Sequence, residues 1–313
     1  MGNNAVEEYP AAATPQSATF RCGYAAIVGR PNVGKSTLLN RIIGQKLSIT
    51  ADKPQTTRHQ ILGVKTLANA QIMYVDTPGI HGDSNRAINR YMNKAAASVL
   101  RDVDVVLFVI QAPKWTDADE AVLEKLRQLS APVILVVNKV DQIKDKSRLL
   151  PYLQQVATKH DYCNVIPLSA KKGDNLEALE RAVLERLPLH PPMFPEDQLT
   201  DRSVRFLVAE LIREKLVREL GQELPYRTTV EIESFKEEEG LTRISAIILV
   251  EAKGQKAIII GRGGERLKSI GTHARQDIEK LLGNKVFLQL WVKVKEGWSD
   301  DARALQSLGY HEP

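Results

Sequence analysis

The sequence predicts an α/β protein in which a doubly wound, mostly parallel sheet is followed by a smaller α+β domain. From residue 20 to about residue 187, short apolar runs alternate with longer segments of helical periodicity, as in repeated strand-helix units. Residues 187–195, LPLHPPMFP, then carry four prolines, which prevent a helix or a central strand. Beyond this break the expected order of elements is helix, strand, strand, helix, strand, which indicates a second unit.

Length and composition agree with two domains. The 313 residues are 43% hydrophobic, which is ample for two buried cores. We expect a disordered tail over residues 1–19, a first domain over 20–187, a linker over 188–202, a second domain over 203–297 and a C-terminal tail over 298–313. The N-terminal tail lacks the basic start and apolar core of a signal peptide, and no run approaches the roughly 20 apolar residues of a membrane span.

The cysteines indicate the compartment. Cys22 and Cys163 are the only two in the chain, and they have no CxxC or metal-ligand spacing. This usage is typical of a reducing environment without disulfide scaffolding. We therefore expect a cytoplasmic location.

In the first domain the apolar runs predict strands over residues 24–28, 72–75, 103–110, 133–137 and 165–167, and helices over 35–43, 117–129 and 175–187. In doubly wound folds, ligands bind beyond the carboxyl ends of the strands. Polar motifs follow several of these strand ends, so we expect the binding site there.

The first motif, GRPNVGKST, follows the first strand and opens a helix. Its glycines let successive backbone N–H groups point at phosphate oxygens, Lys35 is expected to reach the β and γ phosphates, and the Ser36 hydroxyl to coordinate Mg²⁺. A plain glycine-rich turn is the alternative. The expected nucleotide contacts here are Gly29, Arg30, Pro31, Asn32, Val33, Gly34, Lys35, Ser36 and Thr37.

The second motif, DTPG, follows the strand at 72–75. Asp76 is placed to hold Mg²⁺ through water, and Gly79 offers a backbone N–H to a γ-phosphate. An ordinary type I or II turn is the alternative, because Pro-Gly is common in turns. We expect Asp76, Thr77, Pro78, Gly79 and Ile80 to belong to the nucleotide site.

Between these motifs, QTTRH at residues 55–59 is a polar segment where a nucleotide-sensing loop is expected. One threonine hydroxyl would complete the Mg²⁺ shell when γ-phosphate is present, and we favour Thr57 over Thr56. A polar surface loop without a metal contact is the alternative.

The fourth strand ends in NKVD, which selects the base. The Asp141 carboxylate can accept two hydrogen bonds from N1–H and the exocyclic amine of guanine, whereas adenine would leave it buried and unpaired. Asn138 is expected to contact N7 and tie loops together, the Lys139 stem to cover the ring, and a backbone N–H of the SAK segment to approach O6. The expected base contacts are Asn138, Lys139, Val140, Asp141, Ser169, Ala170 and Lys171.

GRPNVGKS, QTTRH, DTPG, NKVD and SAK, in this order, resemble the five guanine-nucleotide motifs of translation-factor-class P-loop GTPases. The resemblance implies GTP or GDP and Mg²⁺ as ligands. Ile80 stands where Ras-like enzymes carry the glutamine that orients water, so the catalytic residue is unknown and slow intrinsic hydrolysis is expected. Arg58 is a nearby cation that we expect to be solvated.

The second domain is expected to begin with an amphipathic helix over residues 203–220, with Gly221 as its C-cap. Strands over 228–235 and 243–251 then form a hairpin around the acidic turn 236–240, and a strand over 286–294 closes the unit. Between them, GRGG precedes a helix over 265–282 whose apolar face carries Leu267, Ile270, Ala274, Ile278 and Leu281.

A GXXG loop at a helix start lets a sugar-phosphate backbone approach closely while apolar neighbours hold unstacked bases. A simple helix-initiating loop is the alternative. Residues 253–295 carry ten Lys or Arg against three acids, a net +7, whereas the whole chain has only +5. This concentration of charge favours nucleic acid. The expected RNA contacts are Ile260, Gly261, Arg262, Gly263, Gly264, Arg266 and Lys268.

This element order resembles a type II KH domain, and a guanine-nucleotide domain followed by one resembles the Era family of GTPases. The likeness extends through PEDQLTDRS, REKLVRELGQELPY and QLWVKVKEGWSDDARALQSLGY. It implies a ribosome-assembly GTPase that binds the 3′ end of 16S rRNA and matures the 30S subunit, and for some members a peripheral association with the cytoplasmic face of the inner membrane.

The final polar run favours packing or a tail over an amphipathic membrane anchor. We expect no DNA partner and a monomer. Two alternatives remain: an RNA-binding module whose nucleotide is structural, and a phosphotransferase that uses the same phosphate loop.

Overall fold

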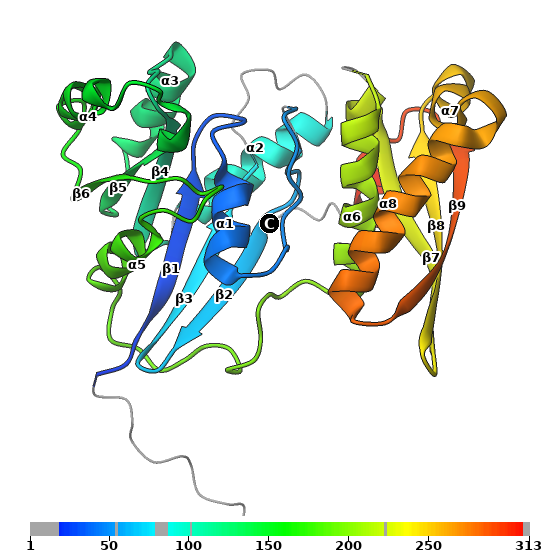
Figure 1. Ribbon diagram of the computed structural model, residues 1–313, viewed down its shortest axis with the longest axis horizontal. Coiled ribbons are helices and arrows are strands. Elements are labelled where there is room, and N and C mark those ends of the chain that lie inside the picture. The colour runs from blue at the N-terminus through cyan, green and yellow to red at the C-terminus, as the bar shows by residue number, and fades with distance from the viewer. Residues whose placement is uncertain (1–18, 54–55, 79–86, 101, 222–223, 309–313) are drawn as a thin grey trace, which may run out of the picture.

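The computed structural model describes residues 19–308 apart from gaps at 54–55, 79–86, 101 and 222–223 (Figure 1). The expected N-terminal tail lies outside the described residues except for its last member, and Gln55, Gly79 and Ile80 lie outside them as well. Two units stand side by side, with helix α6 of the second unit facing the first (Figure 1).

The first unit is built on a six-stranded sheet in the order β2-β3-β1-β4-β5-β6. Every neighbouring pair is parallel except β2 with β3, so the expected mostly parallel, doubly wound sheet is confirmed. The strands are β1 (Arg21–Val28), β2 (Ile61–Leu67), β3 (Ala70–Asp76), β4 (Val105–Gln111), β5 (Val133–Asn138) and β6 (Asn164–Pro167). Strand β2 was not predicted, because an edge strand exposed on one side has a weak apolar pattern.

Helices cover both faces of this sheet. On one face, α1 (Lys35–Ile43) and α5 (Leu176–Leu184) form a core with alternate strand residues. On the other face, α3 (Asp117–Leu126) and α4 (Leu149–Ala157) form a second core. Val99, at the end of α2 (Ala87–Val99), packs against this second core. Helix α1 has the predicted bounds, whereas α3 and α5 end three residues early. Helix α4 was not predicted, because Pro151 disfavours a helix. Pro151 lies in the first turn of α4, where a backbone N–H would have no intrahelical partner, so the proline is tolerated.

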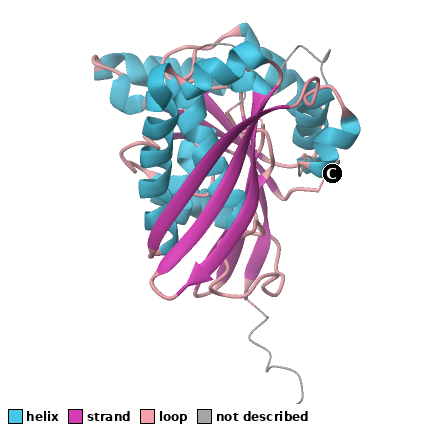
Figure 2. Cartoon of the chain, turned by 90° about the vertical axis from the view of Figure 1, so that its right-hand side faces the viewer, coloured by secondary structure: helices cyan, strands magenta, loops and turns pink. Residues whose placement is uncertain are grey.

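The second unit is a three-stranded sheet with helices against one face (Figure 2). Strands β7 (Thr228–Glu238) and β8 (Leu241–Val250) form the predicted hairpin, and β9 (Lys285–Val294) is parallel to β8. The helices are α6 (Val204–Glu219), α7 (Lys253–Ile260) and α8 (Glu265–Leu282). The predicted order omitted α7, an eight-residue helix too short to show clear periodicity. Short 3-10 turns lie at Val140–Gln142, Lys146–Arg148, Leu224–Arg227 and Arg262–Gly264.

Two predictions about α6 were wrong. The helix is not amphipathic, because its polar residues Glu210, Arg213, Glu214 and Lys215 are buried along with its apolar ones. Its apolar residues pack on β8 and α8, and its buried polar residues Arg213 and Glu214 contact the first unit. Gly221 is not the C-cap: Leu220 has that place with an extended backbone, and Gly221 lacks a left-handed one.

The proline-rich linker contains no helix or strand, as predicted, and it runs along the first sheet (Figure 1). Pro188 accepts a hydrogen bond from Cys22 N at 3.1 Å, and Leu199 accepts one from Val64 N at 2.8 Å. The segment after Glu296, expected to be a tail or to pack, does pack: Trp298 and Leu305, the latter from helix α9 (Ala302–Ser307), are buried with Ile88 of α2.

Candidate nucleotide and RNA sites

The phosphate loop links β1 to α1 through backbone conformations that favour glycine. Gly29 has φ 152° and Gly34 has φ 105°. A Cβ on Gly29 would lie 2.3 Å from the Val109 carbonyl oxygen, and one on Gly34 would lie 2.4 Å from Asn138 Nδ2. Gly34 caps α1 without a side-chain hydrogen bond, so the first N–H groups of the helix remain free to bind an anion.

Lys35 lies at the centre of this loop. Its ammonium donates to the carbonyls of Gly29 at 2.9 Å and Arg30 at 3.0 Å, and its side chain is buried. Burial lowers the pKa of Lys35 to about 8, although the Asp76 carboxylate opposes that shift. A buried cation next to free amides makes this loop suitable for phosphate.

The hydroxyl and carboxylate oxygens expected for Mg²⁺ converge next to Lys35. Asp76 Oδ2 accepts hydrogen bonds from Ser36 Oγ at 2.6 Å and Ser48 Oγ at 2.8 Å, and Thr57 Oγ1 lies 2.8 Å from Ser36 Oγ. Asp76 Oδ1 is buried and has no hydrogen-bond partner among the described residues. Hydroxyl and carboxylate oxygens are the ligands that Mg²⁺ prefers, so these residues fit the metal.

The hydroxyl groups of Thr56 and Thr57 have different surroundings, and Thr57 was the favoured Mg²⁺ ligand of the two. Thr56 Oγ1 donates to the Lys53 carbonyl at 2.6 Å, whereas the Thr57 hydroxyl faces Ser36. Ser48, which also binds Asp76, was not predicted, because a serine in the loop after α1 follows no recognisable motif.

At the base end, Asn138 ties two loops together. Its Nδ2 donates to the Val33 carbonyl at 2.8 Å, and its Oδ1 accepts from Ala170 N at 3.0 Å. Asp141 Oδ1 accepts from Ser169 Oγ at 2.7 Å. Lys139 Nζ donates to the Asn32 carbonyl at 2.6 Å, so its stem crosses the space between the phosphate and base loops.

These loops enclose a cavity of about 860 Å³. Pro31, Asn32, Gly34, Lys35, Ser36, Thr37, Asn138, Lys139, Asp141, Ala170 and Lys171 line it, as do Thr56 and Thr57. Three other predicted residues contact neighbouring elements. Arg30 pairs with Asp119 at 3.1 Å, Val33 is buried in the core, and Thr77 Oγ1 donates to the Ile27 carbonyl at 3.0 Å.

The second unit also contributes to this cavity, which was not predicted. Val217 and Arg218 of α6 line it, together with residues 49–53 of the loop after α1. No local motif marks α6 as part of a nucleotide site, because only the packing of the two units brings it there.

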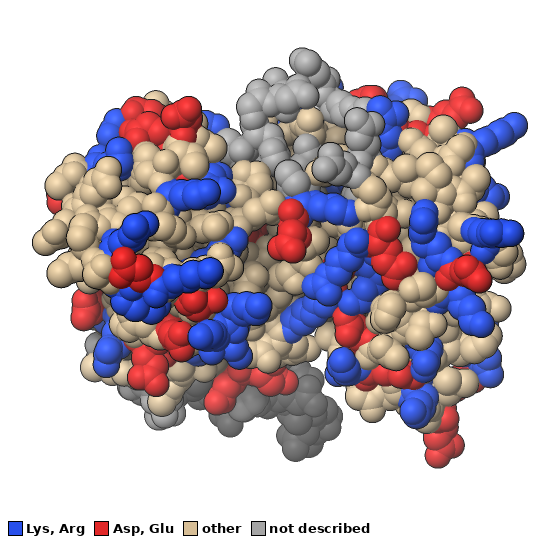
Figure 3. Space-filling view, turned by 45° about the horizontal axis from the view of Figure 1, so that its top comes forward, with Lys and Arg blue, Asp and Glu red and all other residues tan. Residues whose placement is uncertain are grey.

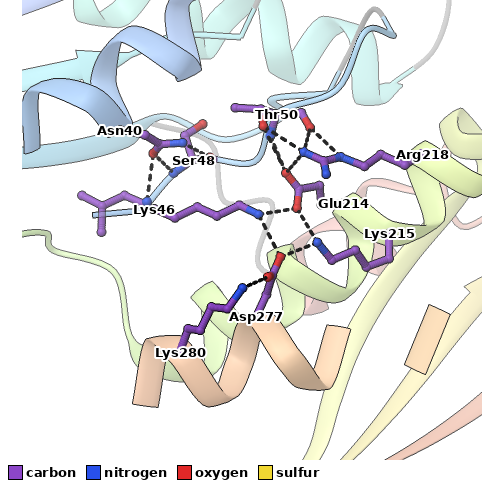
Figure 4. A network of polar contacts seen from close by, with 10 residues as sticks. Asn40, Lys46, Ser48, Thr50, Glu214, Lys215, Arg218, Asp277 and Lys280 are labelled. Atoms are coloured by element: carbon purple, nitrogen blue, oxygen red, sulfur yellow. Dashed lines mark hydrogen bonds and ion pairs between the residues drawn. The ribbon is translucent and has the colours of Figure 1, made fainter. Parts of the chain in front are cut away.

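A charged network joins that loop to α6 (Figure 4). Glu214 is buried and accepts hydrogen bonds from Thr50 N at 3.0 Å, Lys46 Nζ at 2.5 Å and Arg218 at 2.9 Å. Arg218 also donates to the Thr50 carbonyl at 2.9 Å. Burial by itself raises the pKa of Glu214, but these hydrogen bonds and cations outweigh it and lower the pKa.

Figure 3 shows Lys and Arg side chains at this junction of the two units and on the second unit, with acidic side chains between them.

Arg58 is not solvated, contrary to the expectation. It is 1% exposed, and its guanidinium donates to the carbonyl of Thr228 in β7 at 2.8 Å. The two units bury it between them, an arrangement that a polar sequence segment does not disclose.

The GXXG loop lies between α7 and α8. Gly261, Gly263 and Gly264 have φ values of 74°, 59° and 82°, a left-handed region that favours glycine. Arg262, Arg266 and Lys268 are exposed around it, while Ile260 is half-buried. Ile258 of α7, which was not predicted as an RNA contact, is 44% exposed.

A P-loop fold with a guanine-type cavity, joined to a basic domain with a GXXG loop, defines a GTPase that carries a KH domain. The families described as "50S ribosome-binding GTPase" and "KH domain" match residues 24–139 and 223–299. The chain is 60% identical to GTPase Era of Marinobacter nauticus over 295 residues, which are 94% of this chain and 97% of that one. It is 59% identical to GTPase Era of Pseudomonas aeruginosa over 290 residues, which are 93% and 95% of the two chains.

Solved structures agree. A point variant of Aquifex aeolicus Era bound to GDP·AlF4⁻ superposes with a TM-score of 0.89 at 41% identity, covering 93% of this chain and 99% of that one. Era in complex with MgGDPNP and nucleotides 1506–1542 of 16S ribosomal RNA has the same score, identity and coverage. The chain belongs to the GTPase Era family. It binds GTP, GDP and Mg²⁺ and hydrolyses GTP to GDP and phosphate, which decides against the two alternative functions.

Of the helices that the structure describes, none combines the length and the apolar character that crossing a bilayer demands.

Proposed function

We propose that the chain is a GTP-driven assembly factor of the 30S ribosomal subunit that binds the 3′ end of 16S rRNA through its KH domain. A relative of the same two-domain architecture was solved with nucleotides 1506–1542 of 16S rRNA, and the exposed basic residues here surround a GXXG loop. Arg262, Arg266 and Lys268 hold the RNA backbone, and Ile260 lies under the bases.

In the nucleotide site, Lys35 and the amides of residues 29–37 hold the phosphates. Asp141, Asn138, Lys139 and Ala170 hold guanine. Ser36 and Thr57 would hold Mg²⁺ directly, and Asp76 would hold it through water. When bound, Mg²⁺ would neutralise negative charge on the phosphates. The converging oxygens and the unpartnered Asp76 Oδ1 support this assignment.

One observation carries the link between nucleotide and RNA: α6 packs against β8 and α8 of the KH domain, yet its Val217 and Arg218 line the nucleotide cavity. A change at residues 46–53 or 56–58 on GTP binding would therefore alter contacts with the second unit. Coupling of this kind requires contacts that differ between the two states, and the Thr50, Glu214 and Arg218 contacts can differ.

The test measures the affinity of the whole protein for a single-stranded RNA with the 3′-terminal sequence of 16S rRNA. One series contains GDP and Mg²⁺, and the other a non-hydrolysable GTP analogue and Mg²⁺. We expect at least about a fivefold difference, the lower end of usual coupling energies. Equal affinities in the two series would rule out the coupling.

We place the protein in the cytoplasm, which its two free cysteines and the proposed ribosomal partner support. Peripheral association with the inner membrane, the monomeric state, the lack of a DNA partner, slow intrinsic turnover and the domain boundaries stay predictions.

A further inference from the structure

Contacts from the KH domain hold the chain on both sides of Thr57. On one side, Arg213 of α6 donates a hydrogen bond to the carbonyl oxygen of Thr56. On the other, Arg58 donates to the Thr228 carbonyl at 2.8 Å. Both arginine side chains are buried, with 1% exposure. The residue whose hydroxyl faces Ser36 is therefore fixed at its two neighbours by a different domain.

Arg213 is itself held in one orientation. Its Nε and one terminal nitrogen donate to the two carboxylate oxygens of Glu210 at 2.7 and 2.6 Å. A two-point contact between guanidinium and carboxylate fixes direction as well as distance. Because a buried ion pair adds little net stability, the main consequence of this pair is the direction in which Arg213 points.

The position of the Thr56 carbonyl bears directly on Thr57. The peptide unit between them is planar, so fixing its oxygen restricts where the Thr57 Cα can lie. Threonine is branched at Cβ and has few side-chain rotamers, so its hydroxyl follows the backbone. In this arrangement Thr57 Oγ1 lies 2.8 Å from Ser36 Oγ.

We propose that Arg213 is a positioning residue for the Mg²⁺-GTP site: through the Thr56 carbonyl, the KH domain sets the place of the Thr57 hydroxyl. The inference rests on the proposed function, which assigns Thr57 to Mg²⁺. It adds to that function an influence of the KH domain on the nucleotide site: a change in how the KH domain docks on the first domain changes the position of the Thr57 hydroxyl. GDP has no γ-phosphate to order this loop, so the effect is confined to GTP.

The test titrates Mg²⁺ into the whole protein with a fluorescent, non-hydrolysable GTP analogue, and in parallel with fluorescent GDP. The variants are Arg213→Gln, Thr57→Ala and both together. The double change Glu210→Gln with Arg213→Gln removes both charges, so it leaves no unpaired buried carboxylate if the single variant folds poorly. Arg205→Gln is the matched control, because Arg205 lies on the same helix but donates to Ile232 within the KH domain at 2.9 Å.

We expect Arg213→Gln and the charge-neutral double variant to need roughly tenfold more Mg²⁺ for half-saturation with the GTP analogue, as for loss of a hydrogen bond from a charged group. Half-saturation with GDP stays within about twofold, and Arg205→Gln matches the wild type. In the Thr57→Ala background, Arg213→Gln adds less than about twofold, because both changes remove the same contact.

Two results would overturn the inference. Equal losses for GDP and the analogue would show that Arg213 only supports the fold, and fully additive losses in the combined variant would show that it does not act through Thr57. If Thr57→Ala alone leaves the Mg²⁺ requirement unchanged, the metal assignment in the proposed function fails, and the role of Arg213 with it. If Thr57→Ala shifts the requirement and the two Arg213 variants do not, only the present inference fails.

Discussion

Gly34 and Asn138 approach so closely that a Cβ on Gly34 would lie 2.4 Å from Asn138 Nδ2. Gly34 ends the phosphate loop, and Asn138 begins the base-reading loop more than a hundred residues later. The same Nδ2 donates to the Val33 carbonyl at 2.8 Å. The two halves of the nucleotide site are thus in direct contact, and their spacing depends on the absence of one side chain.

We therefore expect Gly34→Ala to abolish nucleotide binding. The left-handed backbone at φ 105° costs about 1–3 kcal/mol for alanine, and the clash also displaces Asn138. Gly44→Ala is the matched control, because Gly44 has φ 78° but no atom within 4 Å of a built Cβ. It should cost about 1 kcal/mol of stability without changing GDP affinity. Titration with fluorescent GDP and thermal unfolding separate the two effects, and equal GDP losses in both variants would contradict the prediction.

Asp141→Asn should change the base that the protein prefers. With an amide in place of the carboxylate, one of the two acceptor oxygens becomes an N–H donor that faces a donor of guanine, so we expect GDP affinity to fall at least about a hundredfold while xanthosine diphosphate, which offers an acceptor there, becomes the better ligand. Competition of GDP, ADP and xanthosine diphosphate against fluorescent GDP measures this. Asp145→Asn is the control, because Asp145 is exposed and its contacts with Ser147 and Arg148 lie within the same short segment. Equal binding of ADP and GDP by the wild type would refute the guanine assignment.

Arg262→Gln should weaken RNA binding and its dependence on salt. Arg262 is exposed in the GXXG loop, and removing one cation from a single-stranded RNA complex lowers the slope of log affinity against log salt by about 0.7. We expect a severalfold loss of affinity at physiological salt. Lys236→Gln is the control. Lys236 lies near the tip of the β7–β8 hairpin, opposite Arg243 in the strand register, whereas the GXXG loop follows the far end of β8. The same loss in both variants would indicate a diffuse charge effect and no RNA site at the loop.

Asp277 should stabilise the contact between the domains in a pH-dependent way. Burial by itself raises the pKa of Asp277, but hydrogen bonds and charges from Lys215 and Lys46 outweigh it and lower the pKa to about 2. Because the folded pKa lies below the unfolded value of about 3.9, the stabilisation is complete above pH 4 and is lost as pH falls through 2. Asp277→Asn should therefore cost about 1 kcal/mol at pH 7, a figure reduced for solvent screening.

Urea unfolding at pH 7 and at about pH 2.5 tests this. The stability gap between wild type and Asp277→Asn should narrow at the lower pH, because at about pH 2.5 the Asp277 carboxyl group of the unfolded wild-type chain is protonated while that of the folded protein is still largely ionised. A gap that stays constant would mean that the substitution acts through packing. Asp300→Asn is a suitable control, since Asp300 is exposed.

Much of the nucleotide site could be predicted from sequence because its chemistry is local. Lys35 and Ser36 must follow a glycine turn at the start of a helix, and Asp141 must follow a strand end by a fixed number of residues. Such requirements leave fixed spacings in the sequence. The same holds for α8, whose Ile270, Ala274 and Ile278 recur at helical spacing and are all buried.

The errors arose where a distant contact overrides the local pattern. Arg58 and the polar residues of α6 have the composition of a solvated surface, yet they are buried because the two domains meet there. Whether a polar side chain faces water or another domain depends on residues more than 150 positions away, which periodicity does not record.

The sequence alone thus determined that this protein has a glycine-rich turn between a strand and a helix, a carboxylate just after the end of a central strand and a basic GXXG loop, because each depends on neighbours along the chain. Only the tertiary structure decided that α6 of the second unit lines the nucleotide cavity and that Arg213 donates a hydrogen bond to the Thr56 carbonyl. The reason is physical: a hydrogen bond between segments distant in the chain forms only after each domain has folded and the two have docked.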